Sequence, residues 1–564
     1  MKRLLILSLL FPAVAFAGPA QRDSIAVSLA SDTGAHFRAS GLIPLDNHDI
    51  WRTGYVLDAS GNFNDIDFNT DGFLDVSRTL DVNFTNDWHR NFRGGVTLDF
   101  GFRGGLSNSR GGEVEQDDVL GTVLPFDKVR GTMTSGHWQS REQNLGGGAH
   151  ARLAIPVYEV GVFDIRLRGA LGSFQSTFGN EGLLPQLASI YYGRNSTVGP
   201  NVICRTLDSK TSSAGGSFVF LGGPSGPHRL SAGLEASSER RLKGFCNTDE
   251  DAWTADPATS FGALGRYEFK PSGSPLSASV ALHATDYVGE GWRFNPEFAA
   301  VWTPREGASL SATVSRHSRF CRPLEENLSV LATGKPLLGD YLTARLEEYW
   351  DALARLDWKL AKGSFELSYL HRSYVCRTFL DYDEGASISF CSLASGGRST
   401  LDEVRASLHL APAPRLTANF GVRYTDARES VPHQSDDIRP MTSRWSAGAD
   451  ARYMTARHRW VFAASASLNG PCRVWDFMKP LDASYADGWT QVYPLVGAKV
   501  TFRTRVCDIY AQGENLTGFK QPLPVIGADD PFSTAFDASC VWGPVLGRNV
   551  RLGIVFLIDK NKKK

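Results

Sequence analysis

The feature that most constrains this chain is an alternation of apolar and polar residues that returns in many short stretches. Near the C-terminus, Val550, Leu552, Ile554 and Phe556 occupy every second position, with Arg551 between the first two. A period of two is that of a β-strand with one apolar face. A strand that is apolar on one side and mixed on the other is typical of the wall of a barrel whose outside contacts lipid.

The same alternation appears at 96–102, 163–168 and 404–424. In the second of these stretches, Asp164 and Arg166 lie between apolar residues. Charges at alternate positions require water or a partner. We therefore expect the polar face of these strands to line a wet lumen.

The N-terminal residues predict export. Lys2 and Arg3 precede an apolar run at 4–11, and Ala15, Phe16 and Ala17 form a small-x-small cleavage site. This pattern predicts a signal peptide at 1–17. No later stretch reaches the roughly 18 consecutive apolar residues of a membrane-spanning helix.

The mature chain offers about 20 to 24 candidate strands, which predicts an all-β, transmembrane antiparallel barrel. We assign residues 18–557 to the barrel and 558–564 to a Lys-rich C-terminal tail. A soluble β-sandwich shows the same alternation. It would not readily supply so many strands without a helical or linker break.

Turns and loops divide unequally between the two ends of the expected barrel. The alternating stretches within 404–424 flank a tight proline turn at 411–414. A long polar, Gly-rich connection is expected at 104–148, and a second long loop is expected at 179–213. Short turns on one side and long loops on the other are typical of outer-membrane barrels, with short periplasmic turns and long extracellular loops.

Charge and motif content exclude two classes of function. The formal net charge is −1, so the chain lacks the basic balance expected of a nucleic-acid-binding protein. The sequence contains neither Gly-x-Ser-x-Gly nor His-Glu-x-x-His. We therefore predict that the protein is not an enzyme and has no nucleic-acid partner.

Eight cysteines are spread along the chain without a CxxC pair, which argues against a zinc or thioredoxin-type site. Export makes structural disulfides feasible. Cys376 and Cys391 flank a turn-like stretch at 381–385 and form one candidate bridge. Cys204 and Cys246 form a second, weaker candidate.

An acidic stretch near the start of the chain is a candidate calcium site. Oxygen-bearing side chains recur at Asp67, Asn69, Asp71 and Asp75, and Gly72 permits a tight turn. Hard cations prefer several converging oxygens of this kind. The bidentate acid of an EF-hand is missing, because that position holds an arginine. The alternatives are an open calcium site completed by other loops and an acidic, solvated turn.

Several uncommon words resemble TonB-dependent outer-membrane receptors, and Bacteroidetes-type members in particular. Near the C-terminus these words are Glu514-Asn-Leu-Thr517 and the segments 528–532, 536–539 and 541–544. Similar words occur in order at 291–327. The resemblance supports about 22 strands and implies a location in the cell outer membrane. It also implies contact with outer-membrane lipid, TonB and the barrel-assembly machinery.

The segment 69–88 resembles an early extracellular hairpin of the cobalamin-type branch of that family. Asn69 and Asp71 fall on its motif, whereas Asp67 and Asp75 are added from their spacing. The resemblance implies that calcium orders substrate-binding loops here. It also implies import of a large scarce nutrient, cobalamin or another metal chelate.

One part of the family pattern is missing from the sequence. Family members carry an N-terminal plug domain, whereas the barrel-like sequence here begins within a few dozen residues of the signal peptide. We expect either a plug supplied by a separate chain or a plugless, passive porin-like or structural barrel. Because an open pore of this bore would be hazardous, loops or a partner are expected to close it.

Overall fold

The computed structural model describes residues 23–31, 34–45, 50–63, 73–74, 76–112, 126–127, 132–133, 138–157, 160–179, 204–222, 226–247, 250–382, 386–393, 397–431, 437–529 and 533–558. The predicted signal peptide at 1–17 lies outside these residues. The predicted Lys-rich tail does too, except that Ile558 belongs to the last strand.

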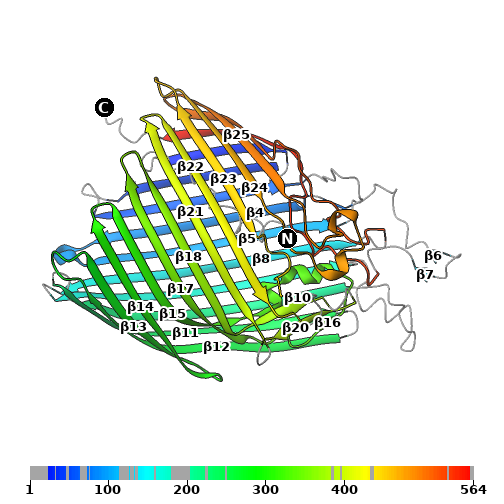
Figure 1. Cartoon of the computed structure of the whole chain (residues 1–564), viewed down its shortest axis with the longest axis horizontal. Coiled ribbons are helices and arrows are strands. Elements are labelled where there is room, and N and C mark those ends of the chain that lie inside the picture. Colours follow the sequence, from blue (N-terminus) through cyan, green and yellow to red (C-terminus); the bar gives the residue numbers. More distant parts are fainter. Residues whose placement is uncertain are drawn as a thin grey trace.

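A single sheet of 22 strands forms the body of the protein (Figure 1). In chain order its strands are β1 (Asp23–Ala30), β2 (Gly34–Pro44), β3 (Trp51–Asn62), β4 (Arg78–Asn91), β5 (Thr97–Gly112), β8 (Gln139–Val157), β9 (Gly161–Gly179), β10 (Cys204–Gly222), β11 (His228–Asn247), β12 (Glu250–Phe269), β13 (Leu276–Tyr287), β14 (Gly291–Arg305), β15 (Ala308–Cys321), β17 (Arg345–Leu360), β18 (Gly363–Cys376), β21 (Ser399–Ala413), β22 (Leu416–Glu429), β23 (Trp445–Met454), β24 (Trp460–Asn469), β25 (Tyr493–Arg503), β26 (Cys507–Glu514) and β27 (Asn549–Ile558). Each strand pairs antiparallel with its neighbours, and β1 pairs with β27, where Val27 lies opposite Ile554. The sheet is therefore a closed barrel, as the sequence predicted.

The two faces of the barrel wall differ in chemistry. On β13, β14 and β15 the register places Leu276, Trp302 and Leu310 side by side, and all three are exposed. Alternate positions along these strands point to the other face and carry polar groups. On that face Arg266 of β12 lies 3.6 Å from Glu297 of β14. Large exposed apolar residues on one face and charges on the other fit lipid outside and water inside.

Strand length varies around the barrel, and it determines how far each part of the wall would extend beyond a bilayer. A tilted strand needs about 9–11 residues to cross. The strands β10, β11 and β12 have 19, 20 and 20 residues, whereas β26 and β27 have 8 and 10. Exposed Trp302, Trp358 and Trp460 lie near strand termini that border short turns. Aromatic side chains at such positions suit the interface between lipid and water.

One end of the barrel carries short turns and the other carries most of the long connections. The predicted proline turn joins β21 to β22, with Ala413 opposite Leu416. At the same end, β15 follows β14 after two residues and β18 follows β17 after two. We call this the short-turn end. The opposite, long-loop end carries the connections 322–344, 377–398, 470–492 and 515–548.

The two long connections predicted at 104–148 and 179–213 are shorter than expected. Residues 104–112 continue β5, and residues 139–148 begin β8. Gly104 lies opposite Gly147, and Gly105 lies opposite Gly146. Likewise, β10 begins at Cys204 rather than after the predicted loop end at residue 213. The prediction was wrong because glycine was interpreted as a turn signal, whereas here cross-strand pairing with the neighbouring wall holds these residues in strands.

The predicted bridge between Cys376 and Cys391 is wrong, because both residues are free cysteines. The hairpin of β19 (Thr378–Asp381) and β20 (Ile388–Ser392) places Phe379 opposite Cys391. Cys376 instead ends β18 and lies opposite Glu348 of β17. The turn was identified correctly, but its strands begin two residues after Cys376. For the second candidate, the backbone register places Cys246 opposite Thr206 rather than Cys204, and both side chains lie outside the described ones.

Short strands and short helices lie in the loops. β16 (Leu337–Leu338) pairs with β20, and β6 (Phe126–Asp127) pairs with β7 (Thr132–Met133). Two short helices, α2 (Pro323–Glu326) and η2 (Leu328–Ala332), lie in the connection 322–344. The other short helices are η1 (Arg93–Gly95), η4 (Asp476–Met478) and η5 (Ala483–Tyr485). No helix in the described part of the chain is long and apolar enough to cross a bilayer.

Candidate functional site

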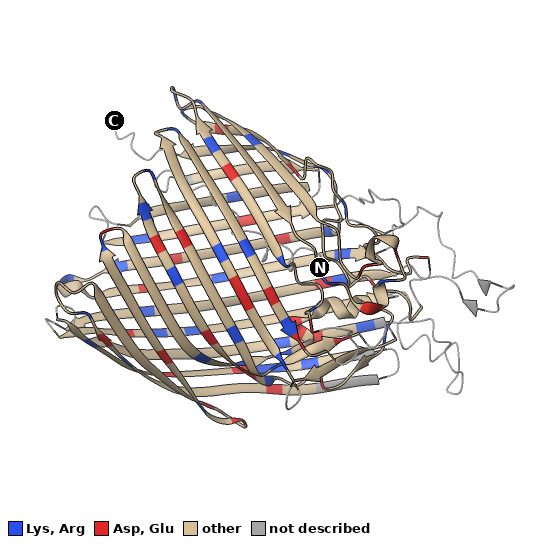
Figure 2. Cartoon of the chain, viewed as in Figure 1, with Lys and Arg blue, Asp and Glu red and all other residues tan. Residues whose placement is uncertain are grey.

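The lumen face of the strands is charged along its length. Figure 2 shows basic and acidic positions spread over many strands rather than confined to the two ends. Asp164 of β9 is a buried example, with Arg152 of β8 and Arg166 of β9 at 2.9 and 2.7 Å. The sequence predicted that Asp164 and Arg166 would face water in the lumen. The structure confirms the inward face and adds that Asp164 pairs with both arginines.

At the long-loop end, several connections fold together into one body that we call the cap. The cap comprises the connections 322–344, 377–398, 470–492 and 515–548, as far as they are described, with the strand-end residues that they cover. Its apolar core joins buried residues of all four connections. The core includes Leu324, Val330, Leu331, Ile388, Val474, Trp475, Met478, Tyr485, Ile526, Phe536 and Trp542. Because the four connections share one apolar core, they form a packed unit rather than separate loops.

The cap reaches from one wall of the barrel to the opposite wall. The connection 515–548 links β26 to β27, and its Phe536 ring lies 4.8 Å from that of Trp138, beside the start of β8. Going from β26 through β27, β1, β2, β3, β4 and β5 to β8 takes seven of the 22 steps around the barrel, and going on through β9 and β10 to β11 takes ten, which is close to halfway. The inward residues Phe178 of β9, Leu207 of β10 and Phe245 of β11 join the same core. The cap therefore crosses the mouth of the lumen.

The base of the connection 515–548 is fixed by one asparagine. The Nδ2 of Asn515 donates hydrogen bonds to the carbonyl oxygens of Phe519, Leu546 and Gly547, at 2.8, 2.9 and 3.1 Å. Asn515 has a φ of 45°, in a left-handed region that asparagine tolerates better than most residues. The side chain thus joins the two ends of the loop just after β26.

An ion pair is buried inside the cap. The Nζ of Lys335 lies 2.9 Å from Oδ2 of Asp537, and these side chains are 2% and 0% exposed. The Nζ also lies 5.0 Å from the ring centre of Phe477. Arg205 of β10 donates to the carbonyl oxygens of Thr333, at 2.7 Å, and Lys335. These contacts attach three connections to one another and to the wall.

The cap interior excludes water from several titratable groups. Burial raises the pKa of the Cys472 thiol to about 12. Burial also raises the pKa of Tyr485 to about 12, where the Tyr485 hydroxyl donates to the carbonyl of Pro522 at 2.9 Å and accepts from Nε1 of Trp542 at 3.0 Å. Groups that stay neutral in a dry interior hold the cap together through hydrogen bonds and packing.

The predicted calcium ligands Asp67, Asn69, Asp71 and Asp75 all lie outside the described residues. Phe73, in the same stretch, is buried in the cap core and stacks on Phe536 with ring centres 5.8 Å apart. Among the residues that the structure does describe, no cluster of three His, Cys, Asp or Glu side chains could hold a metal ion. The calcium site remains a prediction.

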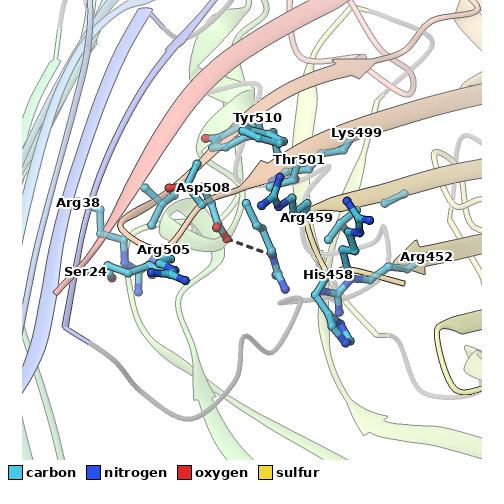
Figure 3. Close-up of a pocket in the computed structure, with 18 of the residues that line it drawn as sticks. Ser24, Arg38, Arg452, His458, Arg459, Lys499, Thr501, Arg505, Asp508 and Tyr510 are labelled. Atoms are coloured by element: carbon cyan, nitrogen blue, oxygen red, sulfur yellow. Dashed lines mark ion pairs between the residues drawn. The ribbon is translucent and has the colours of Figure 1, made fainter. Parts of the chain in front are cut away.

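At the short-turn end, the lumen wall contains a cavity of about 1200 Å³ rich in basic residues (Figure 3). We call it the basic cavity. Its lysine and arginine residues are Arg38, Arg452, Arg457, Arg459, Lys499, Arg503 and Arg505. Among the described residues that line the cavity, one is acidic, Asp508. Its carboxylate lies 3.3 Å from Nε of Arg503.

Strand register shows that the basic cavity faces the lumen. Arg503 lies opposite Asp508, and Lys499 lies opposite Gln512. Between and beside these residues, the outward positions carry exposed Val500 and Ile509. Lys499 places its Nζ 4.0 Å from the ring centre of Tyr510. Figure 3 shows Arg38, Arg459, Arg505 and Lys499 around a common space.

The sequence analysis missed the basic cavity, although a signal was present. Two consecutive short-turn connections carry Arg457, Arg459 and Arg505, in the runs Ala456-Arg-His-Arg459 and Arg503-Thr-Arg505. Combined with the alternation of β23 and β25, these turns place cations at one end of two neighbouring hairpins. The contribution of β1 and β2 could not be found without knowing that the barrel closes between β1 and β27.

Comparison with known proteins gives a likeness in structure. No protein-family model matches the sequence, and no curated protein matches it. A mutant of the ferric enterobactin receptor PfeA from Pseudomonas aeruginosa superimposes with a TM-score of 0.63 at 13% identity, over 96% of this chain and 81% of that chain. The ferric-catecholate import receptor Fiu from E. coli K12 has a TM-score of 0.62 at 10% identity, over 95% and 82% of the two chains.

The FrpB iron transporter from Neisseria meningitidis (F3-3 variant) has a TM-score of 0.62 at 11% identity, over 96% of this chain and 82% of that chain. Identities this low establish a shared fold. The chain is thus an all-β closed barrel of 22 antiparallel strands, the barrel fold of TonB-dependent receptors that its sequence motifs resemble.

Proposed function

We propose that the protein is an outer-membrane import barrel for a large metal chelate. The observation that carries this proposal is a closed barrel, apolar outside and charged inside, whose long-loop mouth is crossed by a packed cap. A barrel of this size needs a wet lumen for its cargo and a closure against leakage. The fold likeness to import receptors supports the transport role at the level of architecture.

We further propose cobalamin as the cargo, because the segment 69–88 resembles the cobalamin-type branch. In this proposal the long-loop end faces the cell exterior, and Asp67, Asn69, Asp71 and Asp75 hold calcium that orders the loops next to the cap. A plug from a separate chain would occupy the lumen and receive energy through TonB. Lipid would surround the apolar outer face.

The alternative function, a passive porin-like or structural barrel, is less well supported. A porin needs a lumen open to solute at both mouths. Here the Lys335–Asp537 pair and the aromatic contacts of Phe536 connect loops across one mouth. A packed cap of this kind suits gated passage better than free diffusion.

Uptake of labelled cobalamin by cells that express this chain together with a plug partner tests the proposal. A gated importer predicts saturable uptake that stops when an uncoupler collapses the proton-motive force. Ferric chelates serve as competing cargo, and cells with an empty vector give the background. Uptake that rises in proportion to concentration and ignores the uncoupler would establish passive diffusion instead.

A further inference from the structure

We propose that the basic cavity is a docking site for an acidic polypeptide segment that enters the barrel through its short-turn mouth. The inference rests on the proposed function only for the side of the membrane that this mouth faces. It adds the chemistry of the partner and the residues that receive it. The partner must carry several carboxylates, interrupted by apolar side chains.

Three cations of the basic cavity have no acidic partner among the residues that the structure describes. In the described part of the chain, no carboxylate lies within ion-pair distance of Arg457, Arg459 or Arg505. Arg503 is paired with Asp508, and Arg38 lies 3.8 Å from Asp58. Like charges gathered in one concave wall repel one another and concentrate anions. An anionic occupant would relieve this repulsion.

The width of the cavity favours a chain over a small anion. Its lining residues come from seven consecutive strands and their turns, in the order β23, β24, β25, β26, β27, β1 and β2. Strands lie about 4.8 Å apart, so this wall is about 30 Å wide. A phosphate or carboxylate ion could contact only two or three of the cations. An extended segment of about nine residues, at roughly 3.3 Å per residue, could contact most of them.

The lining also contains apolar surface. Ala463, Val555 and Leu557 lie on inward positions between the cations and are partly exposed. These residues would contact apolar side chains of a peptide, whereas a bare polyanion would leave them in water. Lys499 and Arg503 lie on the inward face of the wall, opposite to exposed Val500 and Ile509.

Access to the cavity is from the short-turn end. Arg457 and Arg459 lie on the turn between β24 and its predecessor β23, and Arg505 lies on the turn between β25 and β26. All three are exposed at the rim. The other mouth is crossed by the cap. The rim cations would therefore meet an acidic segment first and guide it to Arg503 and Lys499 deeper in the wall.

Binding of a fluorescent peptide to the purified full-length barrel in detergent tests the proposal. The probe alternates Glu with Ala over about twelve residues, long enough for the wall. The control probe has Gln at each Glu position. The test variant is Arg457→Gln/Arg459→Gln/Arg505→Gln. A matched control, Arg93→Gln/Lys270→Gln/Arg415→Gln, removes three exposed cations from other turns of the same end.

We expect salt-sensitive binding of the Glu probe, about tenfold weaker in the test variant and unchanged in the control variant. Circular dichroism confirms that both variants keep the barrel. Equal binding of the Gln probe, or an equal loss in both variants, would overturn the docking site. If inorganic phosphate displaces the probe when both are present at equal total negative charge, the cavity is a site for small anions instead. Because this assay involves no transport, a failed uptake experiment leaves its result unaffected.

Discussion

The Lys335–Asp537 pair provides a sharp test of how the cap is held. Replacing Asp537 with Ala leaves the Lys335 ammonium 2% exposed, beside the Phe477 ring and without its carboxylate at 2.9 Å. Breaking a buried pair in this way costs about 3–5 kcal/mol. The substitution also removes the acceptor for the amide and hydroxyl of Ser539, at 2.8 and 2.6 Å, which adds about 1 kcal/mol for each lost hydrogen bond.

This cost falls on the cap rather than on the barrel wall, because local units open independently of the most stable part of a protein. A loss of about 3–5 kcal/mol raises the open population by roughly two to four powers of ten. The assay is the conductance of single barrels in planar bilayers, with hydrogen exchange of residues 515–529 and 533–548 as a second readout. We expect Asp537→Ala to open frequently and to exchange these amides faster than the wild type.

Two further variants separate the buried pair from a general effect of lost charge. Asp340→Asn breaks the exposed pair with Arg345, at 3.0 Å, and should cost under about 1 kcal/mol. The double variant Lys335→Met/Asp537→Leu removes both buried charges and should recover most of the closure. If Asp537→Ala conducts and exchanges like the wild type, the pair does not hold the cap.

Three further predictions concern the cap core, the pH dependence of the cap and the proposed calcium site. Phe536→Ala removes a fully buried ring that contacts Trp138 and should lower the unfolding free energy of the cap by about 3–5 kcal/mol, measured by hydrogen exchange. Cys472 has a folded pKa raised from 9.0 to about 12 by burial, so its contribution to cap stability is full below pH 9.0 and is lost as pH rises from there toward 12. A cap that denatures at the same urea concentration between these two pH values would contradict the assignment. Asp71→Asn should abolish any protection of the 63–77 connection from protease by calcium, and wild-type cleavage that is indifferent to a calcium chelator would remove the calcium proposal.

The barrel could be predicted from the sequence because the alternation of apolar and polar residues within each strand shows which side chains point outward and which point inward. Val550 to Phe556 and the stretch around Asp164 alternate with a period of two, and the burial pattern follows that alternation. Lipid on one side and water on the other impose this pattern locally, strand by strand. The proline turn at 411–414 is equally local.

The cap and the basic cavity depend on contacts between residues far apart in the chain. Lys335 meets Asp537 across about 200 residues, and no local period marks either residue. The words that resemble TonB-dependent receptors nevertheless include cap residues, since Asn515, Phe536, Asp537 and Trp542 fall within them. The resemblance therefore marked the right segment of sequence, while the physical role of its residues came from the structure.

The misplaced loop ends and the wrong disulfide have a common cause. Gly104, Gly147 and Cys376 were interpreted from local turn signals, whereas strand register decides where a barrel strand ends. Residues that look flexible in isolation are held by hydrogen bonds to the neighbouring wall. Register is set around the whole closed sheet, and a single strand does not contain it.

The central claim, a closed barrel with lipid outside and water inside, is tested most directly by a spin-label scan along β27 in lipid vesicles. Single cysteines replace residues 550 to 557 in turn, in a background without the native cysteines. The structure predicts that labels at 550, 552, 554 and 556 collide with oxygen dissolved in lipid, and that labels at 551, 553, 555 and 557 collide with a water-soluble nickel chelate. Equal accessibility to the nickel chelate at all eight positions would contradict a membrane-embedded barrel.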